Sequence, residues 1–345
     1  MKELKEVQDV KKFQIEAGRL LHSATHEEII NGATADLYFV RTRELLAYAG
    51  KEKTPVVAEI FCSRPGVLAG VEEAYNLIKN KNVSIWALPE GEEIEQKEVV
   101  MRISGPYDEF GMYETALLGI LASASGWATA ARACRDAAGD KPIFCFGARH
   151  VHPAVAPVME RASLIGGATD CSCIMGAKLL GREPVGTVPH AAILIIGDTV
   201  ETAILYDKVM PPDSPRIILV DTFRDEAEES LRVARALKER VSGVRLDTPA
   251  ERGGVTPGLV REIRARLDME GYFYVTILVS GGITAERIPP LAEAGADAFG
   301  VGSYISAARP IDMTMDIKEI DGKPIAKRGR IPGITDNPRM IKLKG

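Results

Sequence analysis

The second half of the chain alternates short runs of β-branched and other apolar residues with stretches of helical periodicity. Seven strand-like runs follow one another, at residues 141–150, 164–172, 184–193, 216–223, 243–248, 274–283 and 296–305. Strands that are separated by helices are typical of parallel βα units. The pattern therefore predicts an α/β fold in which the parallel strands close into an irregular barrel.

The first part of the chain has a different pattern of apolar and turn-forming residues. Residues 20–110 mix short β-like runs with turn signals, and residues 313–333 return to a hairpin pattern with Asp321-Gly322 as its turn. Between these segments, residues 110–138 are rich in alanine and leucine at helical spacing. We therefore predict a smaller β-rich α+β domain at residues 1–125, the barrel at 126–310, and a C-terminal segment, 311–345, that packs back on the first domain.

Composition narrows the class of protein. With 345 residues and 46% hydrophobic content, the chain is long enough for a large core. Its formal net charge of -5 is spread along the sequence, so no basic stripe is available for nucleic acid or an anionic membrane. The start is charged and no later run is long and apolar enough to span a membrane, which predicts a cytoplasmic protein. Five cysteines are an odd number without metal-finger spacing, so we expect reduced thiols and no structural metal.

Polar residues cluster where the strand-like runs end. These positions hold Arg149, Asp170, His190, Asp221, Asp247, Ser280 and Ser303. In a barrel of parallel strands the carboxyl ends of the strands share one rim, and that rim carries the chemistry. We therefore expect the functional side chains to meet there.

Two glycine turns follow the last two runs. The first is Ser280-Gly281-Gly282, and the second is Gly302-Ser303. Glycines at such turns let backbone N–H groups approach phosphate oxygens, and the N-terminus of a following helix adds a favourable dipole. The alternative is a pair of tight turns that merely need positive φ. The order of the two motifs favours a phosphate-binding site.

Two carboxylates end successive runs, Asp221 and Asp247. A sugar that develops positive charge, or the Mg²⁺ that accompanies a pyrophosphate, requires acceptors of this kind. Each residue is equally compatible with capping the helix that follows it.

The ordered motifs resemble a known family. They are Phe146-Gly147-Ala148-Arg149, Gly186-Thr187-Val188-Pro189-His190, Val220-Asp221-Thr222, Val244-Arg245-Leu246-Asp247, Ser280-Gly281-Gly282 and Gly302-Ser303. Together they resemble the nicotinate, nicotinamide and quinolinate phosphoribosyltransferases of the type II fold, in an archaeal-like short form that lacks a C-terminal zinc knuckle. The resemblance runs from about residue 30 to residue 335.

The resemblance implies a role for each matched position. Phe146, Arg149 and Arg245 would bind the pyridine, and Tyr38 would close the ring's other face from a neighbouring subunit. Asp221 and Asp247 would hold the ribose and the Mg²⁺ carried by phosphoribosyl pyrophosphate. Ser280, Gly281, Gly282, Gly302 and Ser303 would hold the 5-phosphate. Lys327 and Arg328 would reach the pyrophosphate, although their charge pattern fits a solvated basic turn equally well.

Two further positions bear on the reaction. His190 matches the histidine that relatives phosphorylate with ATP, so ATP is a candidate co-substrate; a lone histidine of this kind is otherwise a core residue. Ser172 stands where nicotinamide enzymes carry an acid, although a shift of two residues would place Asp170 there. Few basic residues are left for a second ring carboxylate. The sequence therefore predicts nicotinate phosphoribosyltransferase, with quinolinate (decarboxylating) and nicotinamide phosphoribosyltransferase as alternatives.

Two more distant alternatives are weaker. An aldolase or isomerase barrel would use the same phosphate site, but an aldolase would need a lysine at a strand end, and none stands at the rim positions. A protein that kept the fold and lost catalysis would not need both Asp221 and Asp247.

The expected partners are nicotinate and phosphoribosyl pyrophosphate, within a homodimer or higher homo-oligomer that shares its active sites.

Overall fold

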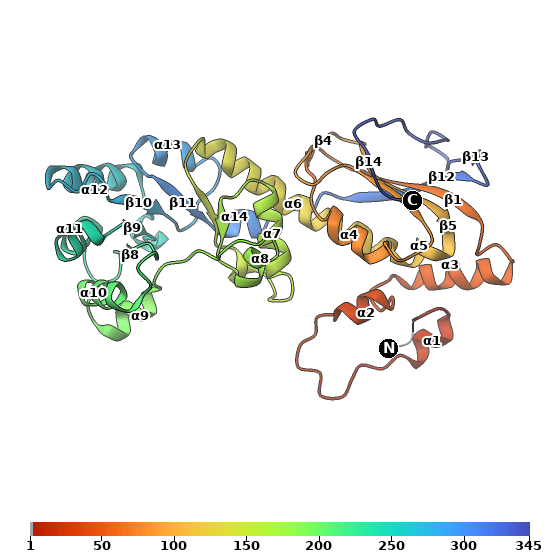
Figure 1. The fold of residues 1–345 in the computed structure, drawn as a ribbon, viewed down its shortest axis with the longest axis horizontal. Helices are drawn as coiled ribbons and strands as arrows, with labels where there is room; N and C mark the ends of the chain where they lie inside the picture. The colour runs from red at the N-terminus through yellow and green to blue at the C-terminus, as the bar shows by residue number, and fades with distance from the viewer. Residues whose placement is uncertain (1–2) are drawn as a thin grey trace. The chain divides into compact units, whose positions relative to one another are not determined.

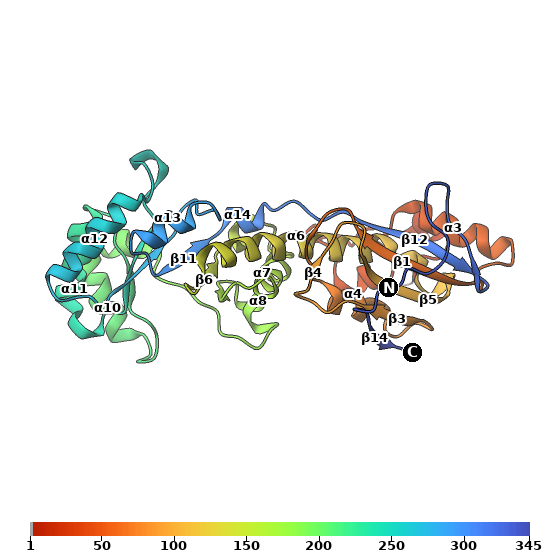
Figure 2. The same cartoon turned by 90° about the horizontal axis from the view of Figure 1, so that it is seen from above.

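The computed structural model describes residues 3–345, which form two compact units. Unit 1 comprises the chain up to Thr129 together with Arg309–Gly345, and unit 2 is Ala130–Ala308. Figures 1 and 2 show the units from two directions. The helix α6 (Glu114–Ala138) crosses from the first unit into the second. No helix of residues 3–345 combines the length and the apolar character that a membrane crossing requires.

Unit 1 is built on an antiparallel sheet of six strands in the order β13-β12-β1-β5-β3-β14. Its strands are β1 (Pro55–Cys62), β3 (Ser84–Ala87), β5 (Val99–Pro106), β12 (Met313–Ile320), β13 (Lys323–Pro324) and β14 (Ile341–Lys344), and a small separate pair joins β2 (Gly66–Val67) to β4 (Glu93–Ile94). Its helices are α1 (Val7–Lys12), α2 (His26–Ile30), α3 (Leu37–Tyr48), α4 (Val71–Ile78), α5 (Tyr107–Phe110) and η1 (Gly111–Tyr113).

The C-terminal segment of the chain completes this sheet, as the sequence predicts. β12 pairs with β1 in antiparallel register, with Met315 opposite Ile60. Asp321 and Gly322 both have positive φ, of 50° and 72°, between the paired residues Ile320 and Lys323. This is the conformation that a two-residue hairpin turn needs. The predicted β-rich domain made from both ends of the chain is therefore confirmed.

Unit 2 holds a parallel sheet of six strands in the order β7-β6-β11-β10-β9-β8. The strands are β6 (Ile143–Cys145), β7 (Asp170–Cys171), β8 (Ile217–Leu219), β9 (Gly243–Leu246), β10 (Thr276–Val279) and β11 (Ala298–Val301). The helices are η2 (Ala148–His150), α7 (Ala156–Ile165), α8 (Ile174–Lys178), α9 (His190–Ile196), α10 (Thr199–Val209), α11 (Glu226–Leu237), η3 (Lys238–Arg240), η4 (Ala250–Arg252), α12 (Pro257–Met269), α13 (Ile288–Glu293) and α14 (Ser303–Ser306). Both views show α10, α11 and α12 along one side of the strands. The predicted α/β class is confirmed.

One predicted strand is wrong. Residues 184–189 form an extended loop, and residues 190–193 belong to α9, which begins at His190. Pro184 and Pro189 have no N–H to donate to a sheet ladder, which weakens any strand in this segment. The loop nevertheless follows the edge of the sheet, where Val185 N donates to Cys171 O over 2.9 Å. The barrel is therefore irregular, because a loop stands between β7 and β8 where the sequence predicts a strand.

Candidate active site

A cavity of about 410 Å³ opens in unit 2 where the parallel strands end. Its walls come from the residues that follow β6, β7, β9, β10 and β11, and from the loop before α9. The lining residues are Phe146, Ala148, Arg149, His150, Ser172, Gly186, Thr187, Arg245, Asp247, Ser280, Gly281, Gly282, Gly300, Gly302 and Ser303. The structure thus brings together ten of the residues predicted for the site, all from the barrel unit.

Arg245 lines the cavity. On β9 its neighbours Val244 and Leu246 are fully buried, and alternation along the strand turns Arg245 to the other face. Its Nε donates to Ser280 Oγ over 2.9 Å, and its Nη1 donates to Thr187 Oγ1 over 2.9 Å. Burial lowers the pKa of its guanidinium, which remains positively charged because an arginine pKa begins so high. The side chain is a cation fixed on several sides.

Phe146 helps to fix that cation. The guanidinium carbon of Arg245 lies 5.2 Å from the centroid of the Phe146 ring, within cation–π distance. A Cβ added to Gly300 would lie 2.5 Å from this ring, so only glycine allows the phenyl group to cross β11 so closely. Phe146 therefore orients Arg245. Direct stacking of Phe146 on a pyridine stays a prediction.

The two glycine turns owe their glycines to different causes. Gly281 and Gly282 have φ of 85° and 62°, a conformation that other residues adopt only with strain. At Gly302 the reason is space, because a Cβ there would lie 2.7 Å from the ring of His150. The first turn therefore depends on backbone conformation, and the second makes room for a side chain.

Glu160 lies behind the cavity and links two of its loops. Its carboxylate on α7 is fully buried and accepts hydrogen bonds from the backbone N–H groups of Ala148 and Cys173 and from the Ser172 hydroxyl. Ala148 precedes Arg149 in the turn after β6, whereas Ser172 follows β7. This buried acceptor therefore links the segment after β6, which holds Arg149, to the segment after β7, which holds Ser172.

Asp221 and His190 form a pair that lies outside the set of lining residues. His190 Nε2 and Asp221 Oδ2 are 3.1 Å apart, with the Asp221 side chain fully buried and that of His190 about 40% exposed. Burial raises the pKa of Asp221, His190 lowers it, and the charge of Asp247 raises it again, with a net upward shift. Asp221 Oδ1 is buried and lacks a hydrogen-bond partner among residues 3–345. An uncompensated carboxylate oxygen is a natural ligand for a hard cation.

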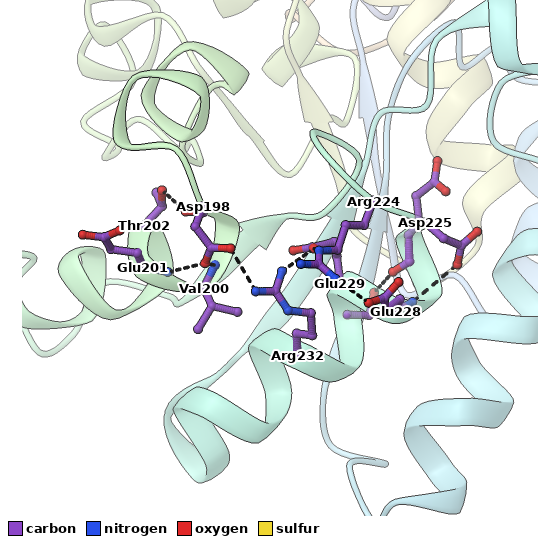
Figure 3. A network of polar contacts seen from close by, with 11 residues as sticks. Asp198, Val200, Glu201, Thr202, Arg224, Asp225, Glu228, Glu229 and Arg232 are labelled. Carbon is purple, nitrogen blue, oxygen red and sulfur yellow. Dashed lines mark hydrogen bonds and ion pairs between the residues drawn. The ribbon is translucent and has the colours of Figure 1, made fainter.

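A network of charges fixes the loop that follows Asp221. Figure 3 shows Arg232 of α11 between Asp198 and Glu229, with Nη2–Oδ2 2.9 Å to Asp198. Arg224, three residues after Asp221, also pairs with the fully buried carboxylate of Glu229. The loop from β8 to α11 is therefore anchored by ion pairs close to Asp221 in the sequence.

Three predicted site residues belong to unit 1. Tyr38 on α3 is 56% exposed. Lys327 Nζ lies 2.6 Å from Asp316 Oδ1, so its charge is engaged within unit 1, and Arg328 is exposed. Their roles toward pyridine and pyrophosphate stay predictions, as does phosphorylation of His190.

Some residues of the cavity are not among those predicted from the sequence. His150 is the most informative of these, because it adds a basic side chain beside Arg149; its Nδ1 lies 3.3 Å from Ser306 Oγ. The only sequence signal that could have identified His150 as a site residue is its position directly after Arg149. Thr187 and Gly186 stood inside a recognised motif, but only the structure shows that Thr187 reaches Arg245.

Comparison with known families covers both parts of the chain. The model of the quinolinate phosphoribosyl transferase N-terminal domain matches residues 36–125, and that of the C-terminal domain matches residues 127–316. The chain belongs to the quinolinate phosphoribosyltransferase family. The resemblance to type II phosphoribosyltransferases is thereby confirmed, and so, at the level of the family, is the prediction of a phosphoribosyltransferase enzyme.

Relatives of this family member include a solved structure. Nicotinate-nucleotide pyrophosphorylase from Pyrococcus furiosus is 43% identical, with a TM-score of 0.87 over 92% of this chain and 82% of that one. A nicotinate phosphoribosyltransferase of Mycobacterium tuberculosis is 30% identical over 69% of this chain and 52% of its own length. A probable carboxylating nicotinate-nucleotide pyrophosphorylase of Methanothermobacter thermautotrophicus is 24% identical over 77% and 89%. The chain spans about half the length of the first curated relatives it matches.

These comparisons overturn the predicted substrate preference for nicotinate. Both family models describe quinolinate phosphoribosyl transferase, and the 43% identical structure is that of a nicotinate-nucleotide pyrophosphorylase. The prediction was wrong because it rested on a count of basic residues near the ring. That count gave the cavity Arg149 and Arg245 and overlooked His150.

Proposed function

We propose that this protein is a nicotinate-nucleotide pyrophosphorylase, which joins quinolinate to phosphoribosyl pyrophosphate and releases carbon dioxide. The observation that carries the proposal is a cavity lined by three basic side chains, Arg149, His150 and Arg245, in a chain whose two domains match the quinolinate family. A dicarboxylate in a partly dry cavity needs several cationic or donor groups, and this set supplies them.

The reaction is a substitution at the anomeric carbon of the ribose. The ring nitrogen forms the new bond as the bond to pyrophosphate breaks, and pyrophosphate leaves with the electron pair. The carboxylate beside the ring nitrogen then leaves as carbon dioxide, its electron pair stays on the ring, and a proton takes its place. Positive charge on the sugar favours nearby carboxylates, for which Asp221 and Asp247 are the candidates.

Magnesium would arrive with the pyrophosphate of the substrate. The unpartnered, buried Oδ1 of Asp221 is a fitting oxygen ligand for such a hard cation. Asp247 is fixed differently, because its Oδ1 lies 2.8 Å from the Ser280 hydroxyl. We infer that Asp221 faces the metal and that Asp247 faces the ribose hydroxyls.

The assembly is part of the same proposal. Tyr38 lies on α3 and leaves more than half of its surface exposed. We propose that the enzyme is a homo-oligomer in which Tyr38 serves the site of a neighbouring copy.

The test compares pyridines. We expect the kcat/KM for quinolinate to exceed that for nicotinate by about a hundredfold, equivalent to about 2.7 kcal/mol. Carbon dioxide release from carboxyl-labelled quinolinate should match the formation of nicotinate mononucleotide one to one. Arg149→Met and His150→Gln should each lower the kcat/KM for quinolinate, while Arg266→Met, on the exposed face of α12, serves as the matched control. Preferential use of nicotinate, without carbon dioxide release, would contradict the proposal.

A further inference from the structure

The first glycine turn has no helix close enough to favour an anion. After Gly282 the next helix, α13, begins only at Ile288 and has six residues. The helix after Gly302, α14, has four. A helix dipole acts within about its first turn, and a helix this short contributes little. The helix dipole expected from the sequence is therefore a weak source of positive potential at Gly281-Gly282.

Arg287 provides a positive charge at this turn. Its Nη1 donates to Gly282 O over 2.7 Å and to Gly281 O over 3.2 Å. Its Nη2 donates to Val255 O over 2.7 Å, which ties the turn to the loop after β9. No carboxylate within residues 3–345 forms an ion pair with Arg287, so its charge is not neutralised by a neighbour.

The hydrogen bonds from Arg287 also fix how the two glycine peptides are oriented. Every peptide bond of the described chain is trans, so the C=O and N–H of one peptide point in opposite directions. The carbonyls of Gly281 and Gly282 point to Arg287, and the N–H groups of Gly282 and Ile283 consequently point away from it. Both glycines line the cavity. A cation on the carbonyl polarises the peptide and makes its N–H a stronger donor.

We propose that Arg287 is a positioning residue for a phosphate monoester. It holds the Gly281-Gly282 turn in its positive-φ conformation from behind and strengthens the N–H groups that face the ligand, without touching the phosphate. The ligand class is a sugar 5-phosphate, and the inference rests on the phosphate-binding part of the proposed function. It adds a determinant of phosphate affinity outside the cavity wall.

The experiment measures binding of ribose 5-phosphate to the full chain by calorimetry, with ribose as the ligand without a phosphate. Arg287→Met should weaken ribose 5-phosphate binding about tenfold, equivalent to about 1.4 kcal/mol. Arg287→Lys should recover part of this loss, because it keeps the charge. Arg287→Gln keeps a donor without the charge and should fall between Met and Lys. Arg266→Met, an exposed arginine paired with Glu262 on α12, is the matched control and should bind as the wild type does.

Steady-state kinetics separate a positioning role from general damage. In Arg287→Met the KM for phosphoribosyl pyrophosphate should rise about tenfold, while the KM for the pyridine stays within about twofold. Equal losses for both substrates, wild-type binding by Arg287→Met, or no ribose 5-phosphate binding by the wild type would each overturn the inference. If Arg287→Met does not fold, the order of Lys above Gln decides in its place. Ribose 5-phosphate binding with this pattern, but without quinolinate turnover, would support the inference and reject the proposed function.

Discussion

Two buried carboxylates, one in each unit, differ in how completely they are hydrogen-bonded. Glu59 on β1 is 1% exposed and is surrounded by donors: Arg102 Nε at 2.9 Å and the N–H of Thr335 at 3.0 Å. Asp221 in the barrel unit is equally buried, yet one of its oxygens has no partner among residues 3–345 and its only ion pair in that range is to His190.

The difference separates charges that hold the fold from charges kept for a ligand. A carboxylate with a complete set of donors has no capacity left for substrate or metal, and its removal leaves the surrounding donors unpaired. A carboxylate that is buried and incompletely paired costs stability, and such residues concentrate at functional sites. The completeness of hydrogen bonding, rather than burial, distinguishes the two roles.

Replacement of Glu59 tests the structural side of the comparison. Glu59→Gln should lower the free energy of unfolding of unit 1 by about 3 kcal/mol, because Arg102 would lose its buried counter-charge. Both tryptophans, Trp86 and Trp127, belong to unit 1, so urea unfolding followed by tryptophan fluorescence reports on this unit. The exposed Glu95→Gln should unfold as the wild type does. A Glu59→Gln midpoint equal to that of the control would show that complete pairing adds no stability here.

Replacement of the rim carboxylates tests the functional side. Asp221→Asn and Asp247→Asn should each lower turnover by about a hundredfold, equivalent to about 2.7 kcal/mol, because in the proposed mechanism each removes a charge that would face the cationic sugar or its metal. Urea unfolding should stay close to that of the wild type. Asp268→Asn, on the exposed side of α12, is the control. Near-normal turnover in both rim variants would remove these residues from the active site.

The pH dependence of kcat/KM and of stability tests the comparison further, and the expected effect is the smallest. Because the pKa of Asp221 is raised in the folded protein, protonation of this group favours folding, and its contribution to stability decreases as the pH rises through the folded pKa. In the proposed mechanism the ionised form of Asp221 would bind the metal, so the acid limb of kcat/KM should lie above the pKa of about 3.9 of a free aspartate.

Measurement of kcat/KM between about pH 4 and pH 8 locates that limb. In Asp221→Asn, the limb should shift or disappear in the residual activity, and the variant should be no less stable than the wild type at neutral pH. An unchanged limb in this variant would assign it to another group.

The sequence was most informative where one residue determines its own geometry. Gly281 and Gly282 were recognisable because positive φ favours glycine, and Asp247 was recognisable because it directly ends a strand. The prediction of a strand at residues 184–193 was wrong because apolar periodicity takes no account of the backbone N–H donors that Pro184 and Pro189 lack.

The remaining features depend on contacts between distant segments. Arg245 is fixed by Thr187 and Phe146, which lie 58 and 99 residues before it, and no local pattern reports such pairs. Arg287 acts through backbone carbonyls, which every residue possesses, so its sequence context carries no signal. Local motifs located the site, whereas its electrostatics came from the tertiary structure.

The loop between β7 and β8 gives the barrel a mechanical property that a continuous sheet would lack. In a continuous sheet each strand is paired with its neighbours by a series of backbone hydrogen bonds. The loop at residues 184–189 instead contacts β7 through the backbone hydrogen bond of Val185 and β9 through the side-chain contact between Thr187 and Arg245. Arg245 also holds Ser280, at the start of the first glycine turn. A ligand that binds this guanidinium would therefore contact the side chain that donates both to Thr187 in the loop and to Ser280 in the phosphate turn.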